Sequence, residues 1–210
     1  MSLWQFFAQN HAEVWQLTLE HLWMVGISMA IAVAIGVPVG IWLTRRQVME
    51  KPVLGMANVI QTIPSLALFG FLLPAPWIGA RAERIAVLAL VLYALLPVIR
   101  NTYVGIMGVD RAVVEAGRGM GMTSRQLLFQ VELPLALSVI IAGVRVATVI
   151  SVGLATIAAA IGAGGLGEFI FRGLAMVNNV VILAGAVPAA ILALLADFGL
   201  GLLEKRLRPA

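Results

Sequence analysis

The sequence contains no cysteine and only two histidines. Without cysteine, the chain can form neither a disulfide framework nor a thiolate metal site. The two histidines, His11 and His21, lie near the amino terminus, and no candidate nucleophile or set of metal ligands accompanies them. An enzyme would need such a constellation. We therefore expect that this chain is not an enzyme and that it holds no catalytic, cofactor or metal site of its own.

Charged residues are also scarce. They make up 11% of the 210 residues, whereas hydrophobic residues make up 61%, and the mean hydropathy is +1.02. Because a soluble domain carries about 25% charged residues, this composition predicts an integral membrane protein in contact with lipid. The net charge of +4 would suit nucleic-acid binding in a soluble protein. Here the basic residues are better explained as topology signals, and we expect no nucleic-acid partner.

Long apolar runs are the main feature that the sequence does contain. A run of about 20 residues is long enough to cross the hydrocarbon core as a helix. These runs predict an all-α integral membrane protein with about five transmembrane helices. They form a single domain over residues 1–210, which leaves no room for a separate nucleotide-binding domain. The predicted spans lie near residues 21–44, 53–75, 85–105, 134–161 and 178–203.

The distribution of Lys and Arg predicts the orientation of these spans. With the amino terminus outside, ten of the 14 basic residues fall in inward-facing segments and three in outward-facing segments. This satisfies the positive-inside rule. We expect a multi-pass protein of a prokaryotic cytoplasmic (inner) membrane, with its carboxyl terminus in the cytoplasm. The first 20 residues contain no Lys or Arg, unlike a cleavable signal peptide, so the first span is expected to remain in the protein.

The longest inward-facing connection, residues 106–133, carries many polar residues between two apolar spans. Asp110 is a suitable cap for a first short helix, and Thr123 and Ser124 offer a second helix start after Gly121. We therefore predict a helix, a turn and a second helix. One alternative is an amphipathic helix that lies on the membrane surface. The other is a helix that contacts a soluble partner.

The spacing within this loop carries a family pattern. Glu115 and Ala116 are followed after four residues by Gly121, and after nine more by an aliphatic residue, any residue and Leu-Pro. The pattern resembles the cytoplasmic signature of ABC importer permeases, with Gly117 in place of a usual second alanine and Val131 in place of isoleucine. The resemblance implies the type I (MetI-like) permease fold and a short helix that inserts into a groove on a separate ATP-binding subunit, which holds ATP and Mg. The implied coupling residues are Glu115, Ala116, Gly117, Arg118, Gly121, Leu133 and Pro134.

Three further stretches resemble one branch of this family, the osmoprotectant permeases. They are NVIQTIPSLA at residues 58–67, LPVIRNT at 96–102 and IGAGGLG at 161–167. The resemblance implies import of glycine betaine, choline, carnitine or a related compound, with an extracytoplasmic substrate-binding protein and a second permease copy or paralogue. An alternative in the same class is an importer of another small solute, such as an amino acid. A stand-alone channel or secondary carrier is less favoured, because only Arg145 and Asp197 supply titratable groups within the spans.

Polar residues at membrane depth identify a candidate translocation pathway. In the second span, Gln61, Thr62, Pro64 and Ser65 combine three polar side chains with a helix breaker, which suits a watery lining. The alternative is a structural kink in which the hydroxyl groups bond to freed carbonyls. Arg145 lies about 16 Å into the fourth span. It should find carbonyl or acidic partners, either as a structural residue or as a contact for a betaine carboxylate.

Other residues near the ends of the spans have simpler interpretations. Trp23, Trp42 and Trp77 are typical of an interfacial aromatic belt. The glycine-rich residues 162–167 predict a membrane-surface turn at the outer gate, because no strand precedes them and no Lys-Ser follows, as a phosphate-binding loop requires. Asp197 is expected to snorkel or to form a pair near the inner interface.

Overall fold

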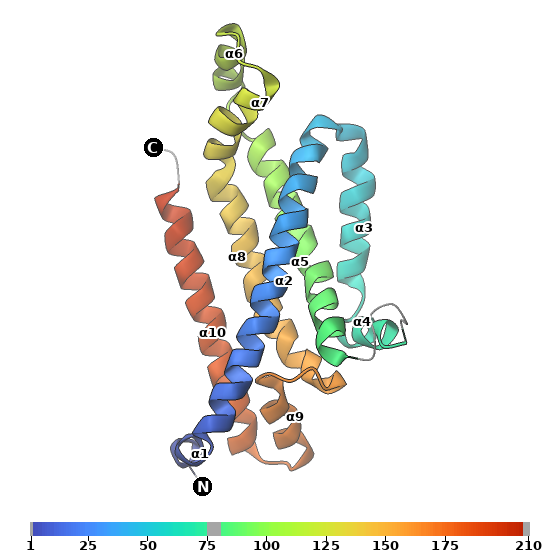
Figure 1. The fold of residues 1–210 in the computed structure, drawn as a ribbon, viewed down its shortest axis with the longest axis vertical. Coiled ribbons are helices and arrows are strands. Elements are labelled where there is room, and N and C mark those ends of the chain that lie inside the picture. Colours follow the sequence, from blue (N-terminus) through green and yellow to red (C-terminus); the bar gives the residue numbers. More distant parts are fainter. Residues whose placement is uncertain (1, 75–80, 208–210) are drawn as a thin grey trace.

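The structure is a computed structural model that describes residues 2–74 and 81–207. All regular structure in these two ranges is helical. Four long helices run along the long axis of the molecule (Figure 1): α2 (His11–Arg45), α5 (Ala82–Met107), α8 (Leu133–Ala158) and α10 (Asn179–Arg206). The described residues contain four candidate membrane spans, or five if a bent helix pair is counted as one span. This confirms the predicted all-α membrane fold.

The second predicted span, 53–75, is not one continuous helix. It consists of α3 (Glu50–Thr62) and α4 (Ser65–Leu72), which are bent by 98° relative to each other, and both residue 75 and Trp77 lie outside the described residues. The break falls at Ile63 and Pro64, whose ψ angles are 126° and 133°. Proline lacks an amide hydrogen and restricts the residue before it, so the helical hydrogen-bond ladder cannot continue through this point.

Three of the long helices extend beyond the predicted spans. α2 begins at His11 rather than near residue 21, directly after the short helix α1 (Leu3–Gln9). α5 begins at Ala82 and α10 ends at Arg206, so charged residues at these ends belong to the helices. Hydropathy places a boundary at the first charged residue, whereas the backbone can stay helical into the interface, where water solvates the charge.

The centre of the bundle is formed by α2, α5 and α8, with fully buried side chains such as Leu90 and Val98. Two glycines on α2 let α5 approach closely. A Cβ on Gly36 would lie 2.7 Å from Val98 Cγ1. A Cβ on Gly40 would lie 2.6 Å from Thr102 Cβ. Since lipid supplies no hydrophobic driving force between helices, such close van der Waals packing holds the bundle together.

Short helices lie at both ends of the bundle (Figure 1). α1 and α9 (Gly167–Ala175) lie at one end, and α6 (Arg111–Gly119) and α7 (Ser124–Leu127) lie at the other. α9 is absent from the sequence prediction, which expected only a turn before it. The amino-terminal helix and the pair α6 and α7 are therefore at opposite ends of the molecule, and α10 runs towards the end that carries α6.

Candidate functional site

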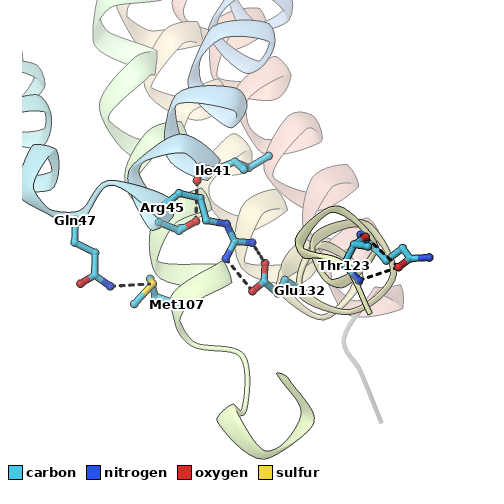
Figure 2. Close-up of polar contacts among 8 residues, drawn as sticks. Ile41, Arg45, Gln47, Met107, Thr123 and Glu132 are labelled. Atoms are coloured by element: carbon cyan, nitrogen blue, oxygen red, sulfur yellow. Dashed lines mark hydrogen bonds and ion pairs between the residues drawn. The ribbon is translucent and has the colours of Figure 1, made fainter. Parts of the chain in front are cut away.

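The α6–α7 hairpin, residues 110–127, is the helix, turn and helix that the loop sequence predicts. Asp110 begins α6 by accepting a backbone hydrogen bond at 2.9 Å. Gly121 makes the turn with a left-handed φ of +81°, which glycine adopts without steric cost. Thr123 then starts α7 through a capping box with Gln126 (Figure 2), which satisfies amide groups that the first helical turn leaves free. Each boundary of the hairpin therefore has a local cause.

Gly117 is the one buried residue of α6, and it faces α7. A Cβ at this position would lie 2.8 Å from Leu127 Cδ1 and 3.1 Å from Met122 Sδ. The substitution of glycine for the usual alanine costs about 1 kcal/mol in helix propensity. In return, it lets α6 lie directly against the buried Leu127. Gly117 therefore shapes the hairpin rather than its outer surface.

The outward side of α6 carries both charged and apolar groups. Glu115, Ala116 and Arg118 are exposed, and Met120 at the end of the helix is 77% exposed. In the part of the chain that the structure describes, neither Glu115 nor Arg118 forms an ion pair. Both line a hollow of about 320 Å³ between the hairpin and the end of α2. This surface has the composition of a helix that docks in a groove, with polar groups at its rim.

The hairpin is connected firmly to the long helices. A π-helical segment, Leu128–Glu132, joins α7 to α8. Its Glu132 is buried and forms an ion pair with Arg45 at the end of α2 (Figure 2), as a buried carboxylate requires. Pro134 is the second residue of α8 and directly follows the π-helical segment, and Leu133 packs against the core next to it. A displacement of the hairpin would therefore act on α2 and α8 together.

The break between α3 and α4 is held by hydrogen bonds to α5. Gln61 Nε2 donates to the carbonyl oxygen of Tyr93 at 2.7 Å, and the Tyr93 hydroxyl donates to the carbonyl oxygen of Ile63. Thr62 Oγ1 donates to the carbonyl oxygen of Val59 at 2.7 Å. Carbonyl groups freed by a broken helix need such donors in lipid, and these hydrogen bonds favour the structural kink over the pathway. Ser65, half-buried, begins α4 directly after the break.

Gln61 also lines a hollow of about 230 Å³ between α3, α5 and α8. Its other polar walls are Arg100 and Asn101, and Val146 and Ile150 of α8 complete it. Arg100 further lines an adjoining hollow of about 320 Å³ along α3 and α5. The two hollows share Arg100 and form a polar strip on one side of an otherwise apolar bundle.

The sequence alone assigns no role to the side chain of Arg100, which lies in the stretch LPVIRNT at residues 96–102. The structure leaves its side chain exposed, and within residues 2–74 and 81–207 it has no ion-pair or hydrogen-bond partner. The available signal was the pair Arg100 and Asn101, one turn after Pro97 in a long apolar run. An arginine at this depth requires water or a polar partner from outside the chain.

Arg145 does not line these hollows. Its guanidinium forms a bidentate pair with Asp197 of α10, with Nε and Nη2 at 2.6 and 2.9 Å from the two carboxylate oxygens. Nη1 lies 3.2 Å from Glu204 Oε2. Gly201 lies between these acids, and a Cβ there would be 3.2 Å from Nη1. The predicted acidic partners are therefore present, and the arrangement clamps α8 to α10 without contact with Gln61.

At the end that carries α1, the glycine turn is held by α2. Gly162, Gly164 and Gly165 all have positive φ, and the Gly165 amide donates to Glu20 Oε2 at 3.1 Å. Nearby, Arg172 Nη2 of α9 donates a hydrogen bond to Glu13 Oε1 at 2.8 Å. This hydrogen bond raises the pKa of Arg172. No group of three or more His, Asp or Glu side chains in the described part of the chain is arranged to hold a metal ion.

Comparison with known proteins identifies a family of membrane transport proteins. The chain matches the family described as "Binding-protein-dependent transport system inner membrane component" over residues 36–209. It is similar to the carnitine transport permease protein OpuCB of Listeria monocytogenes, at 46% identity over 97% of this chain and 92% of that protein. It is also similar to the glycine betaine/carnitine/choline transport system permease protein OpuCD of Bacillus subtilis, at 44% identity over 97% and 88%.

The fold is also that of a solved transporter. A chain in an inward-facing structure of the MetNI methionine ABC transporter superposes with a TM-score of 0.84 at 23% identity, covering 98% of this chain and 99% of that chain. At this identity the similarity concerns the fold, which is the MetI-like permease fold that the loop pattern implies. The family match and the two relatives, each covering most of the chain, concern the sequence as well. The chain therefore belongs to the family of binding-protein-dependent transport system inner membrane components, the permease subunits of ABC importers.

Proposed function

We propose that this chain is the permease of an ATP-driven importer for quaternary ammonium osmoprotectants of the glycine betaine, carnitine and choline type. The observation that carries this proposal is identity above 40% to permeases named for those compounds, over nearly the whole chain. The motifs at residues 58–67, 96–102 and 161–167 support the same branch. An extracytoplasmic binding protein would select the substrate, and this chain would supply a path through the membrane.

The α6–α7 hairpin is the proposed dock for a separate ATP-binding subunit. Glu115 and Arg118 would contact the rim of a groove on that subunit, and the exposed Ala116 would allow close approach. Gly117, Gly121, Leu133 and Pro134 would act indirectly, by shaping the hairpin and joining it to α8. This chain would bind no nucleotide and perform no catalysis, and ATP and Mg²⁺ would bind on the partner. Closure of the partner would reach α2 and α8 through Glu132 as a rigid-body motion.

The polar strip around Arg100 is the proposed lining of the translocation pathway. Four or five spans enclose little space, so a second permease, either a copy or a paralogue, would face this side. The exposed guanidinium of Arg100 and the amides of Gln61 and Asn101 would then meet water, the partner or a substrate carboxylate. Thr62, Pro64 and Ser65 would contribute the bend that opens this side. The ion pairs of Arg145 support its structural alternative rather than a place in the pathway.

The proposed orientation has the amino terminus outside and the carboxyl terminus in the cytoplasm. It is supported by the excess of Lys and Arg on the side of the α6–α7 hairpin. The position of α1 and α9 at the opposite end agrees with it (Figure 1). A cysteine introduced at Ser2, in this cysteine-free chain, should react with a membrane-impermeant maleimide in intact cells. A cysteine at Ser124 should react only after the membrane is opened, and the reverse pattern would invert the topology.

Reconstituted transport tests the substrate class. Proteoliposomes that contain this permease, its ATP-binding subunit and its binding protein should accumulate labelled glycine betaine, carnitine or choline when ATP is supplied. Methionine serves as the comparison, because the alternative is an amino-acid importer of the same fold. Uptake of methionine alone would overturn the proposed substrate class, but the protein would still be the permease of an ATP-driven importer. Uptake in the absence of ATP would instead favour a channel or a secondary carrier.

A further inference from the structure

A long apolar groove of about 570 Å³ runs between α2 and α5, on a part of the surface that the proposed transport function does not use. One wall consists of Trp23, Ile27, Ile31 and Ile35, one residue per turn of α2, which are 54%, 37%, 36% and 46% exposed. Val91 of α5 contributes to the other wall. Large apolar side chains at this spacing form a continuous ridge along one side of the helix. The groove is therefore a slot for an elongated apolar group.

The length of the groove matches one half of a bilayer. The twelve helical steps between Trp23 and Ile35 correspond to about 18 Å of helix. The hydrocarbon core of a bilayer is about 30 Å thick, so one leaflet occupies about 15 Å of it. Trp23 lies at the end of this ridge, where tryptophan is favoured at the level of lipid headgroups. One acyl chain of a lipid in that leaflet would therefore fill the groove.

The mouth of the groove, at the end that carries α1, has charge to match a lipid headgroup. Arg81, Glu83 and Arg84 line it, at the start of α5. Within the described residues, neither arginine side chain has an ion-pair or hydrogen-bond partner. The other arginine at this end, Arg172, is paired with Glu13 and Glu168. Two arginines and one glutamate leave a net charge of +1, which complements one negative charge.

We propose that this groove is a binding site for a phospholipid with a singly negative headgroup, such as phosphatidylglycerol. Its phosphodiester would be held by Arg81 and Arg84 and by the positive amino-terminal end of α5. One acyl chain would lie along the ridge from Trp23 to Ile35. A helix of another protein subunit could cover the ridge, but an apolar helix would leave both arginines at the mouth without a counter-charge. The charged mouth therefore favours lipid over protein.

Quenching of Trp23 fluorescence tests the proposal directly. The full-length chain, with its other four tryptophans changed to phenylalanine, is placed in phosphatidylcholine nanodiscs. Phosphatidylglycerol with brominated acyl chains is then titrated in. We expect tighter quenching than with brominated phosphatidylcholine. Arg81→Gln and Arg84→Gln should each lower this preference by about fivefold. Glu83→Gln should raise it, because it removes a repulsive charge from the mouth.

Two controls separate a site from general attraction. A protein that keeps only Trp42, at the other end of α2, should show quenching that does not depend on Arg81 or Arg84. Arg46→Gln, an exposed arginine at that other end, should leave the quenching of Trp23 unchanged. Equal quenching of Trp23 by both brominated lipids would overturn headgroup recognition. Absence of quenching by either lipid would overturn the lipid site, because protein would then cover the groove.

Discussion

The α6–α7 hairpin and the interface between α8 and α10 both carry charged side chains, but these are unpaired on the hairpin and paired at the interface. On α6, Glu115 and Arg118 are exposed and form no ion pair with the described residues. Between α8 and α10, Arg145 is held by Asp197 and Glu204. The difference follows from the surroundings. A charge among apolar helices needs a polar partner or water, whereas a charge at the end of the bundle is solvated directly.

This comparison offers a criterion for the other charges of the protein. The pair of Arg45 and Glu132 belongs with Arg145, because both partners come from this chain and join helices. Arg100 belongs with the charges of α6, because it lies exposed on the bundle. Paired charges are therefore expected to affect stability when they are changed. The unpaired charges of α6 and Arg100 are expected to affect assembly or transport.

The largest expected effect is on transport, from reversal of one exposed charge. Glu115→Arg should lower ATP-driven uptake in proteoliposomes by about tenfold or more, because a like charge placed against an interface costs several kcal/mol. Less ATP-binding subunit should co-purify, while the thermal unfolding midpoint of the permease should stay unchanged. Lys51→Glu, an exposed reversal on α3 at the same end, is the matched control. Normal uptake and co-purification in Glu115→Arg would show that α6 is not the dock.

Removal of a paired charge should instead lower the stability of the permease. Arg145→Met should lower the thermal unfolding midpoint, because Asp197 loses its bidentate partner between α8 and α10. The exchange of Arg145→Asp with Asp197→Arg should recover part of that loss, as expected for residues that interact directly. Arg118→Met removes an unpaired arginine and should leave the midpoint unchanged. If Arg118→Met and Arg145→Met lowered the midpoint equally, the distinction between paired and unpaired charges would fail.

A change of size inside the hairpin tests whether its shape matters as much as its charges. Gly117→Val should destabilise the packing of α6 on α7 by about 1–3 kcal/mol, the usual cost of overpacking, and should also lower uptake. Gly117→Ala should remain close to the parent protein, because its Cβ meets only the flexible ends of Leu127 and Met122. Denaturant unfolding and uptake, measured on both variants, provide the comparison. If Gly117→Val kept the uptake of the parent protein, the close approach of α6 and α7 would be dispensable.

The smallest expected effect concerns the break between α3 and α4. Tyr93→Phe removes the hydroxyl that donates to Ile63 and should lower the free energy of unfolding by about 1 kcal/mol. Thr62 is exposed, and its hydroxyl donates to the carbonyl oxygen of Val59 in the same helical turn. Thr62→Val removes this hydrogen bond and should change the free energy of unfolding by less than about 0.5 kcal/mol. Uptake separates the two interpretations of this segment. A loss of uptake in Thr62→Val without a loss of stability would favour the pathway over the kink.

Local features of the structure could be predicted from the sequence because their causes are local. Apolar runs indicated the long helices, and Asp110, Gly121 and Thr123 indicated the two boundaries within the hairpin. The predicted spans for α2 and α5 were too short, because the apolar run ends at a charged residue while the helix continues past it. The helix α9 was missed, because its short amphipathic pattern is interrupted by glycine and too brief to distinguish from a connecting segment.

What the sequence determined by itself is the class of the molecule: a membrane-embedded bundle of helices with a polar helical hairpin whose residue spacing matches a known family pattern. Periodicity, composition and short motifs carry this information, because each depends on residues close together in the chain. Only the tertiary structure decided the partners of individual side chains. Arg145 and Asp197 are 52 positions apart, and Arg100 is exposed without an ion-pair partner among the described residues. Such pairings depend on how the helices pack, and packing is a property of the whole bundle.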